Sequence, residues 1–454
     1  MIRTSPPGPP HPSLGASAGS PRGRHRNRNE AKENAMDSRW SGLKDIAPQE
    51  RLRGTAERTG IDPDALRALD PREGLSTADA DVLVENVIGV MGVPVGLAPN
   101  FIVDGEAVLV PMATEEPSVV AAAANAARLA RECGGFSTSS TGPVMIAQVQ
   151  IIGAADPHAA AARVLEACAE LREAADAVDP MLVSLGGGCR DIEARVVHTR
   201  RGPQVVVHLI VDVRDAMGAN AVNSIAESLS DRIAQLAGGR ALMRILSNYA
   251  DRRIVRARAV FSAAQLGGAA VVENILDAAA LAEADPYRAA THNKGIMNGI
   301  SAVVLATGND TRAVEAGCHA YAARSGSYSA LSRFEANAAG DLEASIEVPM
   351  PVGLVGGATR SNPVARADVA IIGTDSADRL ARVITAVGLA QNVAAVRALA
   401  TEGIQRGHMT LHARTVAVSA GAQGEEITEV ARRLVASGTV RADRAEQVLA
   451  ELRR

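Results

Sequence analysis

Residues 204–220 read QVVVHLIVDVRDAMGAN, a strand-turn-helix pattern from which the expected fold can be built. The run Gln204–Val213 predicts a strand, because branched apolar residues dominate it. A turn of small residues, Asp215–Asn220, follows, and a helix is expected over residues 221–236. Such a turn can bring a phosphate close to the free amides of a helix N-terminus, although an ordinary strand-to-helix turn has the same composition.

The segments on either side extend this pattern into one small domain. Its other expected elements are a strand at 144–152, a helix at 157–177, a strand at 192–198 and a closing strand at 242–246 or 254–260. The resulting β-α-β-β-α-β order is typical of the split βαβ, ferredoxin-like arrangement. We therefore expect a compact ferredoxin-like domain over residues 143–251.

The residues around this domain predict a larger, alanine-rich domain that the small one interrupts. Its first part, 36–142, contains Asp104-Gly105 between two apolar runs, a pattern typical of a β-hairpin. Its second part, 252–401, combines alanine-rich helical stretches with apolar runs such as Val303–Ala306 and Ile346–Val348. These two runs are interpreted as strands of the large domain.

The two ends of the chain differ from the domains between them. Residues 402–454 predict a small helical flap, so the expected fold class is α+β: an α/β large domain, an inserted ferredoxin-like domain and a C-terminal flap. Residues 1–35 hold six Lys or Arg and two Glu, a net charge of +4, which leaves −8 for the rest. Prolines and the lack of an apolar segment predict a disordered tail and not a secretory signal, with Met36 as an alternative start. Residues 15–19, GASAG, match the hydrolase GxSxG pattern by chance, since no strand or helix flanks them.

The composition of the 454 residues is that of globular domains with an aliphatic core. Apolar residues make up 47% and charged residues 22%, whereas aromatic residues make up only 2%. Ala, Val, Ile and Leu must therefore fill the core. The net charge of −4 argues against nucleic acid as the main partner. No uncharged apolar stretch reaches 18 residues, so no membrane span is expected.

The cysteines indicate a reducing compartment. The four are Cys133, Cys168, Cys189 and Cys318, and none forms a CxxC pair. A zinc ribbon is thereby excluded and a disulfide framework is not expected. A cytoplasmic location follows from this usage.

Three segments outside the small domain carry candidate chemistry. The chain has neither GxGxxG nor GxxxxGK[ST], so the common nucleotide-binding motifs are absent. Residues 292–299, HNKGIMNG, and residues 307–310, TGND, are expected on two loops. Lys294 and Asp310 on such loops can pair, which keeps the ammonium fixed as an oxyanion stabiliser, or they form an ordinary surface ion pair. Glu116 is expected between a strand and a helix, where it stays accessible.

Two histidines near the flap are spaced by one helical turn. His408 and His412 can bind a metal from one helix face, but Met409 stands where HExxH needs Glu and no third ligand is evident. No metal site is therefore expected. His408 suits a mobile general acid, and His412 a structural role.

Taken in order, five segments carry a resemblance to a known family. They are Glu115-Glu116-Pro117-Ser118, Asp215–Asn220, Asn293–Gly299, Gly308-Asn309-Asp310 and Arg406-Gly407-His408-Met409. Together they resemble class II 3-hydroxy-3-methylglutaryl-coenzyme A (HMG-CoA) reductase, the soluble bacterial type, from about residue 40 to the C-terminus. The resemblance implies interconversion of HMG-CoA and mevalonate, with coenzyme A as co-substrate and two nicotinamide cofactors used in turn. Mevaldyl-CoA and mevaldehyde are the implied intermediates.

The resemblance implies a role for each candidate catalytic residue. Lys294 would stabilise the oxyanion formed at the thioester carbonyl, and Asp310 would hold Lys294. Glu116 would donate and accept the proton at the mevaldehyde step. His408 would protonate the departing CoA thiolate as a flap closes.

Further binding residues transfer in the same way. The implied substrate contacts are Ser118, Asn248, Arg288, which would clamp the free carboxylate, and Asn298. The implied cofactor contacts are Asp215, Ala216, Met217, Gly218, Ala219 and Asn220 at the pyrophosphate, and Asp179 at the ribose. A carboxylate at Asp179 would repel a 2′-phosphate, which favours NAD and the degradative direction. The alternative for Asp179 is a surface helix-terminal residue.

Two other functions remain open beside the NAD-dependent one. An NADP-preferring biosynthetic reductase of the mevalonate and isoprenoid pathway has the same motifs. A non-catalytic CoA- or acyl-binding protein on the same fold is disfavoured, because Glu116, Lys294, Asp310 and His408 are all present. The family also implies a homodimer or a trimer of dimers, with small-molecule substrates and with neither nucleic acid nor membrane as partner.

Overall fold

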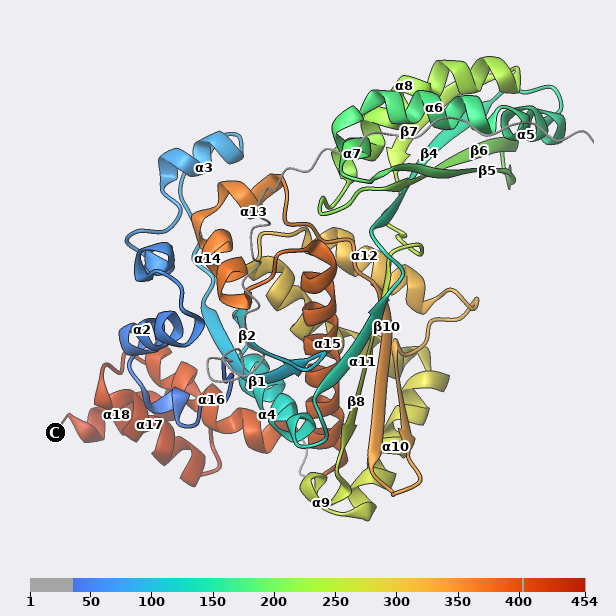
Figure 1. Ribbon diagram of the computed structural model, residues 1–454. Helices are drawn as coiled ribbons and strands as arrows, with labels where there is room; N and C mark the ends of the chain where they lie inside the picture. The colour runs from blue at the N-terminus through green and yellow to red at the C-terminus, as the bar shows by residue number, and fades with distance from the viewer. Residues whose placement is uncertain (1–35, 402–403, 454) are drawn as a thin grey trace, which may run out of the picture. The chain divides into compact units, whose positions relative to one another are not determined.

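The computed structural model describes residues 36–401 and 404–453, and in the helix that begins at Ile404 it describes side chains only from residue 412 onward. Two β-sheets organise these residues (Figure 1). The six-stranded sheet has the order β2 (Glu106–Ala113), β1 (Val95–Val103), β3 (Phe136–Ser140), β8 (Ile254–Phe261), β10 (Leu342–Pro349) and β9 (Ser332–Ala336). The four-stranded sheet has the order β5 (Gly188–Thr199), β6 (Gly202–Asp212), β4 (Val144–Ile152) and β7 (Arg240–Leu246).

The first hairpin of the large sheet forms where the sequence predicts it. β1 and β2 are antiparallel, with Val103 opposite Glu106. Asp104 and Gly105 join them with φ values of 52° and 84°. Positive φ at both central residues is the geometry of a two-residue turn whose twist matches that of the strands, and it explains the Asp-Gly pair.

The small sheet comes from one continuous part of the chain. β4 is followed by α5 (Pro157–Glu166), α6 (Cys168–Val178) and α7 (Pro180–Ser184), then by β5, β6, α8 (Ala219–Ala237) and β7. All its strand pairs are antiparallel. This order and pairing are those of the split βαβ motif. The expected single helix at 157–177 is two helices, because the chain bends at Ala167.

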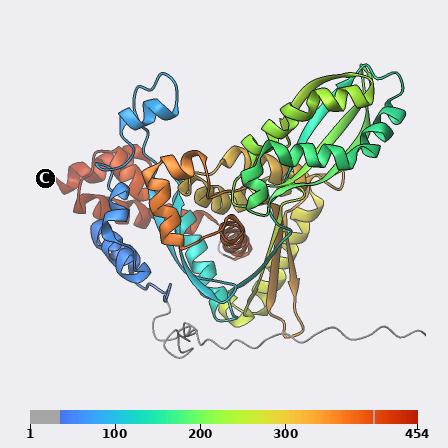
Figure 2. The same cartoon turned by 45° about the horizontal axis from the view of Figure 1, so that its top comes forward.

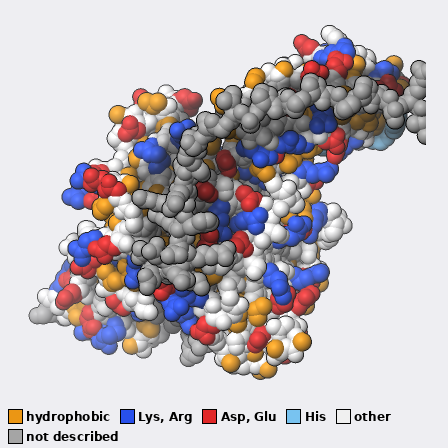
Figure 3. Space-filling view, in the orientation of Figure 1, with side chains coloured by type: hydrophobic (Ala, Val, Ile, Leu, Met, Phe, Trp, Pro, Cys, Tyr) orange, Lys and Arg blue, Asp and Glu red, His pale blue; other side chains and the backbone are white. Residues whose placement is uncertain are grey.

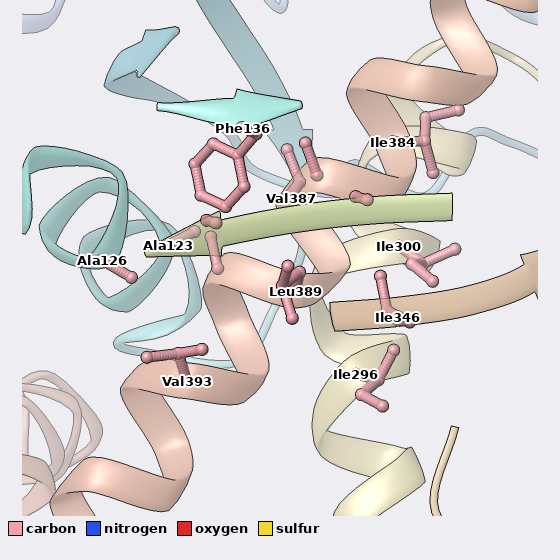
Figure 4. Close-up of a cluster of buried hydrophobic side chains, with 14 of the residues drawn as sticks. Ala123, Ala126, Phe136, Ile296, Ile300, Ile346, Ile384, Val387, Leu389 and Val393 are labelled. Carbon is pink, nitrogen blue, oxygen red and sulfur yellow. The ribbon is translucent and has the colours of Figure 1, made fainter. Parts of the chain in front are cut away.

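One long helix forms the centre of the large core. α15 (Ala377–Ala400) packs against α11 (Pro286–Ala306), α4 (Val119–Arg131) and the large sheet. Figure 4 shows Ile384, Val387, Leu389 and Val393 of α15 among apolar side chains of these neighbours. In Figure 2 α15 is seen nearly end-on, with other elements around it. By length and composition α15 could cross a membrane, but 67% of its apolar window is buried within the protein, as in the core helix of a globular domain.

Glycines let α11 and α15 approach closely. A Cβ at Gly299 would lie 2.8 Å from Cβ of Gln391 and 3.0 Å from the carbonyl oxygen of Val387. A Cβ at Gly388 would lie 2.6 Å from the Ile300 side chain. The two glycines therefore set how closely α11 packs against α15. This distance matters because Lys294 and Asn298 of the candidate site lie on α11.

The remaining helices lie outside the two sheets, and the last three of them form the C-terminal part. They are η1 (Leu43–Asp45), α2 (Pro48–Thr59), η2 (Pro63–Leu69), α3 (Thr77–Leu83), α9 (Ala263–Leu266), α10 (Ala269–Ala284), α12 (Thr311–Ala322), α13 (Gly357–Ser361), α14 (Pro363–Ile372), α16 (Ile404–Ser419), α17 (Glu425–Ala436) and α18 (Ala442–Leu452). The last three share a separate small core around Ala413, Val430, Leu434 and Val448. The mostly helical end expected from the sequence is thus present.

Two expectations about the segment around Lys294 are wrong. Val303–Ala306 is not a strand but the last turn of α11, and residues 292–299 lie within the same helix and not on a loop. Much of α11 is buried by its neighbours, so its apolar residues show no clear helical stripe. A short apolar run does not by itself distinguish a buried strand from a buried helix.

A buried acid on α14 predicts a pH dependence of stability. Asp368 is fully buried, and neither of its carboxylate oxygens has a hydrogen-bond partner. Burial raises its pKa from 3.8 to about 8. Between these values the unfolded chain releases the proton while the folded protein keeps it, so stability is lost as the pH rises.

Asp368→Asn is therefore expected to flatten the stability profile between pH 5 and pH 8. The difference in unfolding free energy between these pH values should shrink by on the order of 3 kcal/mol. Denaturant unfolding at both pH values measures it, with the exposed Asp375→Asn as matched control. Parallel profiles for Asp368→Asn and wild type would show that Asp368 does not titrate in this range.

Candidate active site

Three polar side chains from two distant parts of the chain meet in one hydrogen-bonded group. The ammonium of Lys294 lies 2.6 Å from Oε2 of Glu116, and the amide of Asn298 donates to Oε1 of Glu116 at 3.3 Å. Lys294 and Asn298 are four residues apart on α11, so they share one helix face. Glu116 lies between the end of β2 and the start of α4, as expected.

Local structure on both sides holds this group in place. α11 begins at Pro286 with Asp285 as N-cap, whose carboxylate accepts the amides of Tyr287 and Arg288. The backbone amide of Glu116 donates to Oγ1 of Thr114 at 3.1 Å. The Lys294 side chain is 60% exposed and that of Glu116 35%. A substrate can therefore reach both.

The pairing of Lys294 with Glu116 sets what the group can do. An ammonium has three donors, so Lys294 retains donors for an incoming carbonyl oxygen while it contacts Glu116. A fixed cation at that oxygen stabilises the charge that develops when the carbonyl is reduced. A carboxylate within hydrogen-bond distance can exchange a proton with the same oxygen.

Ser118 and Arg288 are further groups that a ligand could engage. Oγ of Ser118 is buried without a hydrogen-bond partner, and its backbone has φ 76°, a strained value for a residue other than glycine. Among the described residues the Arg288 guanidinium makes no hydrogen bond or ion pair. It is six residues before Lys294 on α11 and so projects from a different side of the helix. Asn248 is exposed in the segment after β7.

Asp310 makes no hydrogen bond to Lys294, Glu116 or Asn298 within the described residues. Its carboxylate caps α12, accepting the amides of Arg312 at 3.0 Å and Ala313 at 3.1 Å. It also lies 3.6 Å from the Arg312 guanidinium. Within residues 36–401 no ion pair joins Asp310 to Lys294, and Glu116 occupies the place beside the ammonium instead. His408 falls within α16, and its side chain lies outside the described residues, whereas His412 is exposed there.

The Asp215–Asn220 turn has the features of an anion site. α8 begins at Ala219 without a side-chain cap, so the amides of its first turn remain available. Gly218 has φ 105°, and a Cβ there would lie 2.8 Å from the Val213 side chain. The free amides of this turn can donate hydrogen bonds to an anion such as a phosphate.

Two acidic side chains of the predicted cofactor site accept hydrogen bonds from backbone amides. Asp215 accepts the amide of Ala377 at the start of α15, at 2.8 Å. Asp179 caps α7 by accepting the amide of Leu182 at 2.9 Å. Asp179 is thus the N-cap residue of α7 in this fold. Among residues with described side chains, no three His, Cys, Asp or Glu side chains are grouped so as to hold a metal ion.

Sequence reasoning missed three residues that build the site. Thr114 orients Glu116, Asn309 accepts the amide of Gly353 at 2.7 Å, and Arg253 donates to carbonyls of the Asp215–Asn220 turn. No signal in the sequence singles out Arg253, because it stands in an ordinary charged run, Asp251-Arg252-Arg253. Asn309 stands in the Gly308-Asn309-Asp310 motif, but the motif does not indicate its bond to Gly353.

Known proteins share this architecture along most of the chain. Residues 47–413 match the family model described as hydroxymethylglutaryl-coenzyme A reductase. The chain belongs to the HMG-CoA reductase family. It is 53% identical to the HMG-CoA reductase of Archaeoglobus fulgidus over 419 residues, which cover 92% of this chain and 96% of that relative.

Solved structures of relatives agree with this assignment. The HMG-CoA reductase of Streptococcus pneumoniae superposes with a TM-score of 0.78 at 39% identity and covers 91% of this chain and 100% of that one. A second structure, described as the class II enzyme of Streptococcus pneumoniae bound to NADPH in open conformations, has a TM-score of 0.76 at 40% identity over 90% of this chain and 100% of that one. The family resemblance seen in the five motifs is confirmed, and the chain is an oxidoreductase of the HMG-CoA reductase family.

Proposed function

We propose that this member of the family interconverts HMG-CoA and mevalonate with NAD as its preferred cofactor, and that it works in the degradative direction. The balanced reaction is mevalonate + CoA + 2 NAD⁺ to HMG-CoA + 2 NADH + 2 H⁺. The observation that carries the catalytic proposal is the contact of Lys294 and Asn298 with Glu116. It unites a cation for a developing oxyanion with a carboxyl group for proton transfer.

Each residue has a defined task in the reductive direction. The nicotinamide cofactor supplies hydride for both two-electron steps. Lys294 donates a hydrogen bond to the thioester oxygen as that oxygen gains negative charge. Glu116 delivers the proton to the aldehyde oxygen of mevaldehyde, and Asn298 keeps the carboxyl group oriented. His408 protonates the CoA thiolate, which would otherwise recapture the aldehyde.

The outer residues hold the substrate. The guanidinium of Arg288, which has no partner among the described residues, supports a contact with the free carboxylate of the glutaryl group. The Oγ of Ser118, which also lacks a partner there, supports a hydrogen bond to the same carboxylate. Asn248 completes the substrate contacts. Asp310 acts through the start of α12 and the neighbouring Asn309, in place of a direct contact with the ammonium.

Asp179 decides between NAD and NADP in this proposal. Asp179→Ser retains an acceptor for the helix cap but removes the negative charge. We expect KM for NAD⁺ to rise about tenfold and KM for NADP⁺ to fall, since repulsion of the 2′-phosphate is lost. Asp156→Ser, which alters the equivalent cap of α5, is the matched control. Equal effects on both cofactors would assign the ribose contact to another residue.

A second candidate is an NADP-preferring biosynthetic reductase. It is favoured by the Streptococcus pneumoniae relative that is described as bound to NADPH. Reduction of NAD⁺ and of NADP⁺ by purified protein given mevalonate and CoA, measured in parallel, distinguishes the two. CoA-dependent reduction of NAD⁺ alone supports the first candidate, and preference for NADP⁺ the second. Stoichiometric binding of CoA or HMG-CoA without any turnover would instead support a non-catalytic binding protein.

An exposed apolar segment supports a homodimer, alone or within a trimer of dimers. From α3 onward Val82 is 85% exposed, Ile88 fully exposed and Met91 87% exposed. Figure 3 shows hydrophobic side chains on the surface at the position of α3. Apolar side chains this exposed, close together in the chain, are typical of a protein interface.

Ile88→Lys is therefore expected to convert the assembly to monomers. A lysine at the centre of an apolar interface buries a charge without a partner. Light scattering after gel filtration measures the mass, and Leu281→Lys, at an apolar position 55% exposed on α10, is the control. A wild-type monomer, or an unchanged oligomer in Ile88→Lys, would place the interface elsewhere.

The cytoplasmic location is part of the same proposal. All four cysteines are free thiols. Burial raises the pKa of Cys189 to about 11, which keeps that thiol protonated and unreactive. Unpaired cysteines throughout the chain are typical of a reducing compartment.

A further inference from the structure

One arginine is buried behind the turn at the start of α8. Arg253 precedes β8 and is 4% exposed. Its guanidinium donates to the carbonyls of Ala216 at 3.1 Å and Met217 at 3.2 Å, and also to the carbonyl of Val352. Desolvation lowers its pKa to about 10, so it remains charged at neutral pH. No carboxylate forms an ion pair with it among the described residues.

The segment Val352–Val355 lies against the same turn. The amide of Leu354 donates to the carbonyl of Asp215 at 2.8 Å, and Ala216 forms a parallel bridge with Val355. A Cβ at Gly353 would lie 2.3 Å from the backbone nitrogen of Met217. Only glycine therefore allows the two backbones to come this close.

The other side of this segment reaches the loop that precedes α12. The amide of Gly353 donates to Oδ1 of Asn309 at 2.7 Å, and Asn309 is next to Asp310. Val352–Val355 thus forms a strap between the Asp215–Asn220 turn and the Gly308–Asp310 loop. The guanidinium of Arg253 bonds both the strap and the turn. It can do so because its N–H donors lie in one plane and point in different directions.

We propose that Arg253 is a positioning residue that, with the Val352–Val355 strap, fixes the Asp215–Asn220 turn relative to the Gly308–Asp310 loop and so sets the affinity for the nicotinamide cofactor. This inference rests on the proposed cofactor role of the turn. Arg253 is too deeply buried to touch the cofactor itself. Arg253 therefore acts only by positioning the backbone of the Asp215–Asn220 turn, which contacts the cofactor in this proposal.

The first test replaces Arg253 by methionine and by lysine. In Arg253→Met the KM for the nicotinamide cofactor should rise at least about tenfold, while the KM for HMG-CoA changes less than about twofold. Arg253→Lys, which keeps the charge but not the fork, should give an intermediate value. Arg252→Met is the control, because Arg252 is exposed and pairs with Glu193. A parallel rise in both KM values, or no change, would overturn the proposal.

A second variant covers the case in which a buried methionine prevents folding. In Gly353→Ala the added methyl group must displace the turn while Arg253 is unchanged, and the same selective rise in cofactor KM is expected. Leu281→Ala is its control, since Leu281 is 55% exposed on α10 and belongs to neither the strap nor the turn. Unchanged cofactor KM in folded Gly353→Ala would overturn the role of the strap.

Direct binding separates this inference from the proposed function. Titration with NADH and NADPH, followed by the fluorescence of the reduced nicotinamide, gives Kd without turnover. If wild type binds a cofactor but does not convert HMG-CoA, the proposed function fails, and the Kd values of Arg253→Met and Gly353→Ala still test the inference. If wild type binds neither cofactor, the inference is overturned as well.

Discussion

Replacing Lys294 by alanine is expected to lower turnover of HMG-CoA by about 10³-fold or more, with the fold intact. The ammonium contacts Glu116 from an exposed face of α11, so its removal leaves the packing of the helix against α15 unchanged. The thioester oxygen then gains negative charge without a cation beside it. Steady-state oxidation of the reduced cofactor measures the loss.

Two checks make the Lys294 result specific. Lys44→Ala removes an exposed lysine and should leave kcat unchanged. Circular dichroism and the unfolding midpoint of Lys294→Ala should match those of wild type. Retained turnover in folded Lys294→Ala would break the assignment of the oxyanion partner.

Replacing Glu116 by glutamine is expected to lower reduction of mevaldehyde by about 10²–10⁴-fold, the range for a lost general acid. Glutamine has nearly the same shape and can still accept from Asn298 through its carbonyl oxygen, but it cannot deliver a proton. Free mevaldehyde, supplied as substrate with reduced cofactor, isolates this step.

Glu115→Gln is the matched control for Glu116→Gln. Glu115 is the exposed neighbour of Glu116 in the chain, and its substitution should leave mevaldehyde reduction within about twofold, as for surface substitutions away from a site. If Glu116→Gln reduces mevaldehyde as fast as wild type, the proton comes from another group. Loss confined to HMG-CoA would then assign Glu116 to the thioester step.

The parts of the fold that were predicted correctly depend on local patterns. Asp104-Gly105 specifies its own turn, and the strands at β4 and β6 alternate or run apolar between clear breaks. The start of α11 is also specified by local residues, because Asp285 is its N-cap and Pro286 is its first helical residue. Such patterns do not show whether neighbouring elements bury one face of an apolar run or all of it. Val303–Ala306 therefore has the pattern of a strand, although it forms the last turn of α11, which is buried against α15.

The candidate site shows the same limit. Glu116 and Lys294 are 178 positions apart, so nothing in their spacing predicts that they touch. The sequence suggested Asp310 as the partner of Lys294, because both stand in polar, glycine-rich segments. In the structure the Asp310 carboxylate is used by the first amides of α12, and Glu116 takes its place. A carboxylate such as that of Asp310 can either cap a helix or pair with a distant lysine. The sequence is compatible with both, and the folded structure uses the cap.

The stoichiometry of the reaction catalysed by the purified wild-type chain tests the proposed chemistry as a whole. HMG-CoA is supplied in limiting amount with excess NADH, and in parallel with excess NADPH, and both oxidised cofactor and mevalonate are quantified. We expect two equivalents of oxidised cofactor and one of mevalonate per HMG-CoA from wild type, and about a thousandth of these amounts or less from Lys294→Ala in the same time. Oxidation of one equivalent, or no mevalonate from folded wild-type protein, would contradict the proposed chemistry.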